Sequence, residues 1–368
     1  AGPARRAVLH VPSVVRPGER LAATVAVLDA AANAVREVTG EIELRWERAE
    51  EPAFVGALEL EHGGALRIEL AAPAEGLHRL GLRLTLGEQV LEAESNPLEV
   101  SPRAPRILWG DLHGHSAESD GTGTPDGWWR YARDVAALDL AALTDHDHWG
   151  LLPLDEHPDR WADNVAAARR AERPGRFLAL PGYEWTSWLW GHHHVLYFGD
   201  ETPLVSSLDE ASDTPQELWA ALEGLAALVV PHHPAGGPIA VDWRIPPDPR
   251  LEPLVEVCSA HGCSEASDAP RAIYSPVPGA WTRDALARGY RLGQIASGDG
   301  HDGHPGLAHL GPQYPTGGLA AILAERPTRD EVLTALRARR AYATSGPRAI
   351  LRFALGSTPM GAELAAPA

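Results

Sequence analysis

The histidines of this chain are concentrated in one stretch of the sequence, and this concentration limits how the chain can fold. Of the 17 histidines, 14 lie between residues 113 and 309. Several of them directly follow an apolar run with the length of a buried strand. They are His113, His115, His146, His194, His233 and His301. Because the carboxyl ends of parallel strands converge on one mouth of a barrel, we expect these imidazoles to meet at one site.

The segment from residue 107 onward has the texture of a parallel α/β fold, in which buried strands alternate with amphipathic helices. The expected strands end near Asp111, Thr144, Tyr183, Val230, Val257 and Ala296. Three threonines carry helix-start signals: Thr124 precedes a proline, and Thr214 and Thr328 begin capping boxes. Repeated βα units over about 240 residues predict a barrel over residues 106–348.

The segments on either side of the expected barrel differ from it. Residues 1–103 show period-two alternation, as at Ile42, Leu44 and Trp46, which predicts an antiparallel β-sandwich, immunoglobulin-like in the broad sense. A proline-rich linker joins this sandwich domain to the barrel. Residues 349–368 form a C-terminal extension that begins like a further strand at Ile350, and the pattern leaves open whether an element is truncated there.

The composition narrows the classes of partner. A net charge of −18 argues against nucleic acid and anionic membranes, both of which need a basic footprint, so we expect a small-molecule substrate. No stretch approaches the ~18 apolar residues that span a bilayer. Cytoplasm is the default compartment, and secretion stays open because the chain starts at alanine and the native N-terminus can be missing. The oligomeric state is not indicated.

Two further features of composition restrict the chemistry. All 32 basic residues are arginine, which removes Schiff-base chemistry, a phosphate-loop lysine and a carbamylated lysine between two metals. Cys258 and Cys263 do not resemble the disulfide framework of a small secreted scaffold. We expect both to be free thiols.

Histidines and carboxylates occur at the spacing of metal ligands. In GDLHGHSAESDG, His113 and His115 point the same way on a strand, and Asp120 can return from the loop as a further ligand. In ALTDHDHWG, His146 follows a buried strand, and in QIASGDGHDG the pair Asp299-x-His301 repeats the same-face spacing. Glu184 ends the third strand, and its two oxygens can bridge two cations.

The histidine runs GHHHVLYF and VVPHHP contain more imidazoles than one site needs. Because adjacent side chains on a strand point to opposite sides, we expect one ligand from each run, His194 and His233. We interpret His192, His193 and His232 as neighbours of the ligands or of substrate. Nine candidate ligands result, enough for three cations. They are His113, His115, Asp120, His146, Glu184, His194, His233, Asp299 and His301.

This ordered set of motifs resembles the PHP superfamily, named for polymerase and histidinol phosphatase domains. The segments WGDLHGHSAESDG, TDHD, EVCSAHGCSE and YATSGPR are similar to those of a bacterial branch of this superfamily whose function is largely unknown. The resemblance covers about residues 106–348. It implies a distorted (β/α)7 barrel with two or three divalent ions of zinc, manganese or iron. Asp120 stands where some members have a histidine. Because a carboxylate is a harder ligand than imidazole, this difference leaves the metal identity open.

Carried over residue by residue, the resemblance implies three ligand sets. The first is His113, His115, Glu184 and Asp299; the second is Asp120, His146 and His301; the third is Glu184, His194 and His233. The implied reaction is hydrolysis of a phosphate ester by a metal-bridging hydroxide. Asp145 or Asp111 would orient the ligands, and His261 would touch substrate or donate a proton.

The candidates for substrate contact are Trp185, Arg271 and His193, with Arg244 and Arg130 as further phosphate clamps and Trp188 and Trp190 as further aromatics near the mouth. Two other functions stay open at this point. One is an amidohydrolase-like hydrolysis of an amide or lactone, restricted to a mononuclear form by the absence of lysine. The other is a non-catalytic metal-binding scaffold whose sandwich binds a partner.

Overall fold

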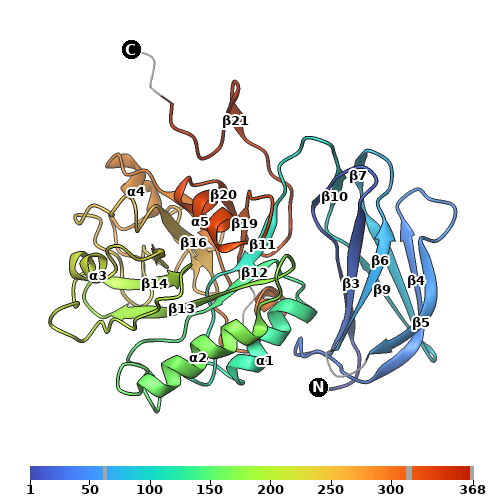
Figure 1. The fold of residues 1–368 in the computed structure, drawn as a ribbon, viewed down its shortest axis with the longest axis horizontal. Coiled ribbons are helices and arrows are strands. Elements are labelled where there is room, and N and C mark those ends of the chain that lie inside the picture. The colour runs from blue at the N-terminus through green and yellow to red at the C-terminus, as the bar shows by residue number, and fades with distance from the viewer. Residues whose placement is uncertain (61–63, 312–316, 365–368) are drawn as a thin grey trace.

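The alternating apolar residues of the first hundred positions form antiparallel sheets, as expected. The computed structural model describes residues 1–60, 64–311 and 317–364, and Figure 1 shows these strands as the blue part of the molecule. The strands are β1(Arg6–His10), β2(Val14–Val15), β3(Arg20–Leu28), β4(Val38–Trp46), β5(Phe54–Leu60), β6(Ala65–Ala71), β7(Gly76–His78), β8(Leu80–Leu86), β9(Gln89–Glu94) and β10(Leu98–Val100).

Two of these sheets, in the orders β1-β3-β6 and β5-β4-β8-β9, are antiparallel throughout. Their inward residues share one apolar core, in which Val25 and Ile68 of the first sheet belong with Ile42 and Leu82 of the second. Each of these side chains is nearly or fully buried. The alternation therefore places one face of each sheet against the other, while a smaller sheet, β2-β10-β7, contains the parallel pair β2-β10.

The second part of the chain is a mixed α/β unit. Its strands are β11(Leu108–Asp111), β12(Leu140–Leu143), β13(Leu178–Ser187), β14(Gly191–Tyr197), β15(Ala227–Pro231), β16(Leu254–Ser259), β17(Gly262–Cys263), β18(Gly293–Ala296), β19(Leu319–Ile322) and β20(Ala341–Thr344). Five of the six expected strand ends are found at or close to their positions, whereas β13 continues four residues beyond Tyr183. These ten strands belong to two sheets. They form a seven-stranded sheet in the order β15-β14-β13-β12-β11-β19-β20 and a three-stranded sheet in the order β17-β16-β18.

The large sheet is not the all-parallel sheet that the sequence pattern suggested. Only β11, β12 and β13 are parallel neighbours; β14, β15, β19 and β20 pair antiparallel. The reason is the short connection after Ser187. Because β14 begins again at Gly191, the chain can only return beside β13 as a hairpin, whereas a parallel neighbour needs a crossover of a dozen or more residues.

The second part of the chain also contains helices and helical turns, and three of the helices start where the threonines predicted. They are α1(Pro125–Arg130), the π-helical turn Tyr131–Val135, α2(Pro158–Ala171), α3(Pro215–Ala221), α4(Thr282–Ala287), the 3-10 turn Ala308–Leu310 and α5(Arg329–Arg337). Thr124, Thr214 and Thr328 each cap a helix, and Thr214 forms the full capping box with Glu217. At Thr328 the box is incomplete, because the Glu331 carboxylate instead accepts from the backbone of Arg326.

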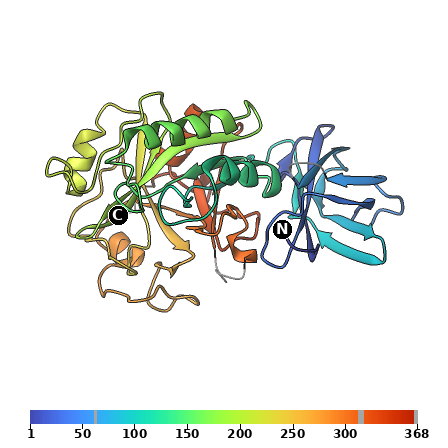
Figure 2. The same ribbon diagram turned by 90° about the horizontal axis from the view of Figure 1, so that it is seen from below.

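The N-terminal sheets pack directly on the α/β unit. Helix α1 and the turn that follows it lie beside the N-terminal strands, as Figure 2 shows. The Tyr131 hydroxyl donates to the Ala32 carbonyl at 2.7 Å, and the buried Trp109 indole donates to the Ser13 hydroxyl at 2.8 Å. These buried contacts join the two parts of the chain around a shared apolar cluster.

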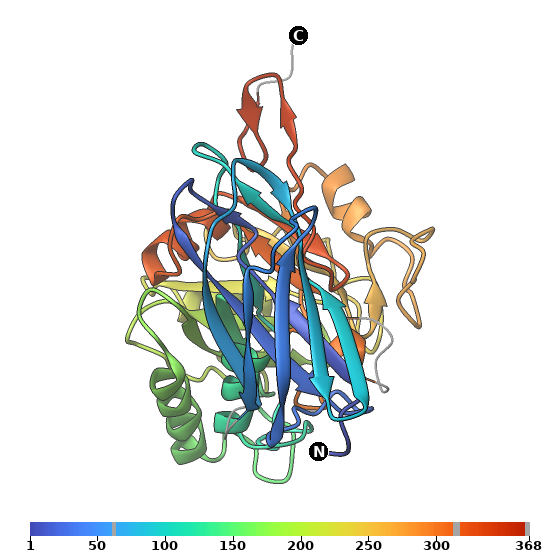
Figure 3. The same cartoon turned by 90° about the vertical axis from the view of Figure 1, so that its right-hand side faces the viewer.

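The C-terminal extension differs from the expected strand. Residues from Ile350 to Phe353 form no strand; the chain instead makes the small exposed hairpin β21(Ala354–Leu355) and β22(Thr358–Pro359), which projects from the molecule in Figure 3. These residues lack a sheet edge to join, so period-two apolarity alone does not make them a strand. Residues 365–368 lie outside the described part of the chain. Among the described residues, no helix is both long and apolar enough to cross a membrane.

Candidate metal centre

Backbone pairing beyond two strand ends brings the first and last predicted motifs together. After β11, His115 donates its backbone N–H to the Gly300 carbonyl at 3.0 Å, and Asp299 donates to the His113 carbonyl at 2.9 Å. Since residues two apart on such a segment share a face, His113-x-His115 and Asp299-x-His301 present their side chains to one another. The Asp299 Oδ1 atom lies 3.3 Å from Nε2 of both His113 and His115.

Glu184 lies at the centre of this histidine cluster and is 1% exposed. Its carboxylate oxygens contact ring nitrogens of five histidines: His192 (2.7 Å), His113 (3.1 Å), His232 (3.2 Å), His146 (3.3 Å) and His115 (3.4 Å). Burial alone would raise the pKa of Glu184, but the surrounding imidazoles, led by His146 and His232, hold it well below its usual range. The two oxygens therefore face different histidines, as a bridging ligand must.

A second cluster stands at the mouth of the site, around Asp120. The Asp120 Oδ1 atom lies 3.3 Å from Nε2 of His301, 3.5 Å from Nε2 of His146 and 3.8 Å from Nδ1 of His115. The predicted set of Asp120, His146 and His301 is thus brought together, with His115 added to it. Four overlapping groups of side chains place their ligand atoms within 4.8 Å of one another. These groups are His115, Asp120, His146 and His301; His113, His115 and Glu184; His192, His232 and His233; and His113, His194, His232 and Glu256.

The third predicted set, Glu184 with His194 and His233, is not brought together in that form. On β14, His192 and His194 share one face, and it is His192 that contacts Glu184. His194 lies deeper, with its ring 3.9 Å from the ring of His113. Strand alternation correctly places His193 on the opposite face from His192 and His194. It cannot distinguish between two histidines on the same face, so it gave no reason to select His192.

His232, which the sequence did not select, takes part in two of the four groups, whereas His233 takes part in one. The backbone explains this. His233 has a positive φ of 35°, so the chain turns sharply there and both neighbouring rings can face the site. His193, in contrast, points to the other side of β14, where its ring lies 5.6 Å from that of Trp185.

Sequence reasoning missed Glu256 altogether. This residue lies in the apolar strand β16, is 1% exposed, and places its Oε1 atom 3.2 Å from Nδ1 of His113. The one available signal was a carboxylate inside the buried run LVEVCS, since a charge is rarely buried without a partner.

The chemistry of the donor atoms fits metal ions. Several buried polar atoms have no hydrogen-bond partner among the described residues: both ring nitrogens of His194, Nδ1 of His232, Nε2 of His192 and Oε2 of Glu256. Buried polar groups are nearly always satisfied, so a set of unpaired nitrogen and oxygen atoms around one point indicates a missing ligand. Imidazole nitrogens together with carboxylate oxygens are typical ligands of zinc, manganese and iron.

Asp111 and Asp145 do not touch the cluster's ring nitrogens; they hold the loops that carry the cluster. Asp111 accepts from the backbone of Gly298 at 2.8 Å and of Gly306 at 2.7 Å, on either side of Asp299 and His301. Burial raises the pKa of Asp111 to about 6. A side chain at position 298 would meet the Asp111 carboxylate at 2.8 Å, so this close approach requires glycine.

Asp145 fixes the other loop in the same way. It accepts from the Ser116 backbone at 2.7 Å and from the Ser119 hydroxyl at 2.7 Å, both in the loop between His115 and Asp120. Its second oxygen accepts from the Ser116 hydroxyl at 2.8 Å. The two aspartates therefore position ligands through the backbone, one for each loop.

A cavity of about 250 Å³ opens on the cluster. His261 lines it, with Nε2 2.9 Å from Oδ2 of Asp299 and a side chain that is 26% exposed. Trp149 stacks on His146 at 5.1 Å between ring centroids, and Trp188 lies 5.1 Å from Trp149. These two indoles and Tyr274 give the cavity aromatic lining.

The residues expected to contact substrate do not line this cavity. Trp185 is fully buried and donates its indole N–H to the Ser212 carbonyl at 3.1 Å, because it faces the opposite side of β13 from Glu184. His193 is buried on that same far side, 3.8 Å from Glu252. Arg271 is exposed and outside the cavity lining.

The cavity's lining also contains no arginine among the described residues. Arg244 forms an ion pair with Asp242 at the surface, at 2.6 Å, and Arg130 lines a different cavity. Trp188, one of the aromatics expected near the mouth, is found there, whereas Trp190 packs against a buried cluster elsewhere. The arrangement can thus bind cations and an apolar group, but it has no guanidinium for an anion.

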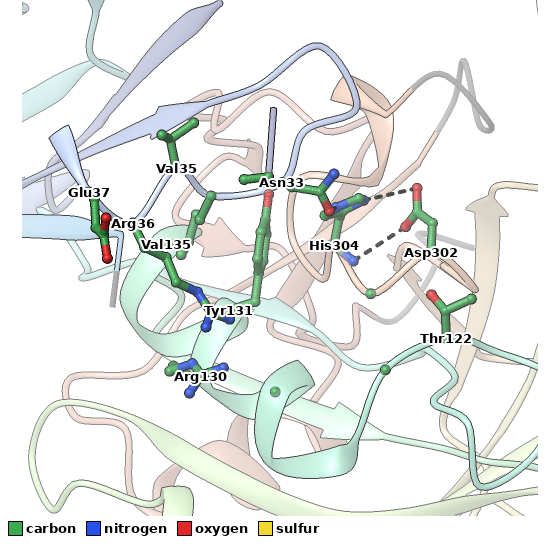
Figure 4. Close-up of a pocket in the computed structure, with 15 residues that line it drawn as sticks. Asn33, Val35, Arg36, Glu37, Thr122, Arg130, Tyr131, Val135, Asp302 and His304 are labelled. Atoms are coloured by element: carbon green, nitrogen blue, oxygen red, sulfur yellow. Dashed lines mark hydrogen bonds and ion pairs between the residues drawn. The ribbon is translucent and has the colours of Figure 1, made fainter. Parts of the chain in front are cut away.

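A second cavity, of about 570 Å³, lies between the N-terminal sheets and the loops of the site, and Figure 4 shows its wall. There His304 Nε2 lies 3.2 Å from Oδ1 of Asn33, a residue of the N-terminal part. Thr122, on the same wall, donates its hydroxyl to the His301 carbonyl at 3.1 Å. The N-terminal part therefore contacts the loop that follows a candidate ligand.

The charges of the cluster lead to a prediction about pH. Burial lowers the pKa of His113 and His146, but neighbouring carboxylates raise it by more. These carboxylates are Asp299 and Glu256 beside His113, and Glu184 beside His146. The pKa of His113 lies well above its usual value and that of His146 is about 10. Since metals bind neutral imidazole, zinc must displace these protons, and its affinity should fall as pH falls.

We expect zinc binding to release more than one proton per chain at pH 7. Titration calorimetry in buffers of different ionisation enthalpy measures this number directly. A binding heat that is the same in every buffer would contradict the assignment of protonated imidazoles to the metal-free cluster.

Comparison with known proteins gives relatives without an assigned activity. The profile of a family described as a protein of unknown function, DUF3604, matches residues 143–236 and 306–366. Uncharacterized proteins of Chlamydia pneumoniae and Chlamydia muridarum are each 28% identical to this chain over 97% of its length. The chain spans 58% of the length of these relatives.

One solved structure is similar over much of the chain. It is a two-domain protein from Bacteroides vulgatus, described as containing a predicted PHP-like metal-dependent phosphoesterase. It is 18% identical, covers 65% of this chain with 65% of its own, and has a TM-score of 0.46.

Proposed function

We propose that this protein is a metal-dependent hydrolase with two or three divalent ions, and that its substrate is a small phosphate ester. The observation that carries the proposal is the buried cluster of imidazoles around Glu184, in which several ring nitrogens have no hydrogen-bond partner among the described residues. Polar clusters of this density are costly to bury unless their atoms have partners, and bound cations would supply them.

Three ligand sets follow from the distances. The first is His113, His115, Glu184 and Asp299; the second is His115, Asp120, His146 and His301; the third is Glu184, His192, His232 and His233. Bound there, divalent ions would lower the pKa of a coordinated water and neutralise charge on a phosphoryl oxygen. Glu184 would serve two sets.

The surrounding residues have separate tasks in this proposal. Asp111 and Asp145 hold the two ligand loops in place. His261 reaches the cavity beside Asp299, where it can transfer a proton to a leaving group. Trp149 and Trp188 can stack on a planar or apolar part of the substrate. Because the described part of the chain contributes no arginine to this cavity, recognition of the phosphate would depend on the metal cluster and its histidines.

Two measurements in sequence test this function. Metal content per chain is determined first, on protein purified without chelator, and fewer than two ions per chain would rule out the cluster. The protein is then assayed on phosphate monoesters, phosphate diesters, amides and lactones, with and without chelator. We expect chelator-sensitive turnover of a phosphate ester.

The same panel separates the two other functions. Chelator-sensitive turnover confined to amides or lactones would replace the phosphoesterase with a carbon-bond hydrolase. Two or three bound ions with no turnover of any substrate would favour a non-catalytic metal-binding scaffold.

A further inference from the structure

The two cysteines of the chain lie opposite each other on a tight hairpin. Strands β16 and β17 are joined by the two-residue turn Ala260-His261, and Cys258 and Cys263 are direct partners across the hairpin. Four residues separate them in sequence, so a link between them closes a small loop. Nothing in the proposed reaction uses either thiol.

The hydrogen-bonding pattern shows what kind of pair this is. The next pair outward is hydrogen-bonded, since Ser264 donates to the Val257 carbonyl at 2.7 Å. In an antiparallel hairpin hydrogen-bonded and non-hydrogen-bonded pairs alternate, so Cys258 and Cys263 form a non-hydrogen-bonded pair. Such pairs have Cα atoms about 4.5 Å apart and side chains on the same face.

This geometry permits a disulfide. Disulfides need Cα separations of roughly 4.4 to 6.8 Å, and the expected separation falls at the lower end of that range. The two thiols hydrogen-bond to each other, so their sulfur atoms already face one another. Both cysteines are partly exposed, which lets a small reagent reach them.

The environment also favours a thiolate. The hydrogen bond from Cys258 lowers the pKa of the Cys263 thiol to about 7, which makes its thiolate available near neutral pH. Exchange with a disulfide begins with attack by a thiolate, and the best attacking thiol has a pKa near the ambient pH. Cys263 is therefore the residue that would react first.

We propose that Cys258 and Cys263 are a reversible redox-modification site that forms an intrachain disulfide with a small-molecule disulfide, such as oxidised glutathione, as oxidant. The Cys263 thiolate attacks one sulfur of glutathione disulfide, forms a mixed disulfide and releases one glutathione thiolate. Cys258 then loses its proton and attacks the Cys263 sulfur, which releases the second glutathione. Two protein thiols are oxidised and one glutathione disulfide is reduced to two thiols.

The position of this pair connects it to the candidate site, although the inference does not rest on the proposed function. The turn beyond the cysteines carries His261, and Ala260 donates its backbone N–H to the Gly298 carbonyl at 3.1 Å. Ser259 donates its hydroxyl to Oδ2 of Asp299 at 3.3 Å. A disulfide would thus close the base of a turn whose tip contacts a candidate ligand.

The experiment uses the full chain, fully reduced and then equilibrated with glutathione redox buffers. Free thiols are counted, intact mass is measured, and the cross-linked peptide is identified after proteolysis. We expect the thiol count to fall from two to zero, with a loss of two hydrogen atoms in mass and no retained glutathione. Dithiothreitol should restore both thiols.

Two comparisons make this test decisive. Cys258→Ser and Cys263→Ser should each retain one mixed disulfide with glutathione. The equilibrium constant for disulfide formation in the native protein should exceed that in concentrated guanidinium chloride by at least about tenfold, because the hairpin holds the thiols together. Unreacted thiols, two retained glutathiones per chain, or equal constants for native and unfolded chain would each overturn the proposal.

Discussion

Glu184→Gln is expected to remove at least two bound ions per chain and to reduce hydrolysis by more than about 100-fold. Mutation of a residue that only supports the ligands of a metal site typically reduces metal affinity or activity 10- to 100-fold. Glu184 contacts five histidines directly, so its loss should have a larger effect. Glutamine keeps the shape of the side chain but removes the negative charge that the imidazoles face. Metal content and initial rates of phosphate-ester hydrolysis measure the two effects.

Glu252→Gln is the matched control for this variant. Glu252 is also a buried glutamate, but it accepts from the Trp219 indole on the far side of the sheet, and burial raises its pKa to about 8. Its side chain is thus largely neutral at pH 7, and the amide should leave metal content unchanged.

His233→Ala should lose less metal than Glu184→Ala, because Glu184 serves two ligand sets. Equal losses from these two alanine variants would contradict the bridging role.

Removing the metals is expected to lower the melting temperature of the protein by about 10 °C. Each ion present at about 100 times its Kd adds about 2.7 kcal/mol to the free energy of unfolding, so two or three ions add about 5 to 8 kcal/mol. For a chain of this length that corresponds to a shift in melting temperature of about 7 to 10 °C. The structural basis of this effect is the buried ring nitrogens of the proposed ligands His192 and His232 that have no hydrogen-bond partner among the described residues. Thermal unfolding with zinc and with excess chelator provides the comparison.

Glu184→Gln again supplies the control. The melting temperature of this variant should differ much less between zinc and chelator than that of the wild type, because Glu184 belongs to two of the three ligand sets. A wild-type melting temperature that chelator does not change would refute the view that the cluster binds metal in the folded state.

The sequence predicted most of the strand ends and most of the clustered residues, because both depend on local patterns. Apolar runs of the right length ended close to where β11, β12, β15, β16 and β18 end. Eight of the nine candidate ligands belong to the four groups whose ligand atoms lie close together in the fold. The ninth, Asp299, contacts both His113 and His115.

What the sequence could not predict depends on pairing between strands. Which histidine of β14 contacts Glu184 depends on how β14 pairs with β13. In the observed register the backbone of Glu184 lies opposite His194, but its carboxylate contacts the ring of His192. Glu256 became visible only when β16 was placed beside His113. Each of these outcomes is a long-range contact, which local periodicity does not encode.

The spread of the ligands along the chain has a consequence for biosynthesis. His113 and His115 leave the ribosome nearly two hundred residues before Asp299 and His301, a delay of roughly 10 to 40 s at 5–20 residues/s. During that time the nascent chain offers only an incomplete set of donors, and backbone pairing between the two motifs cannot form. A cation that binds this cluster would therefore be selected after translation, by the folded chain, from the metals that the compartment supplies.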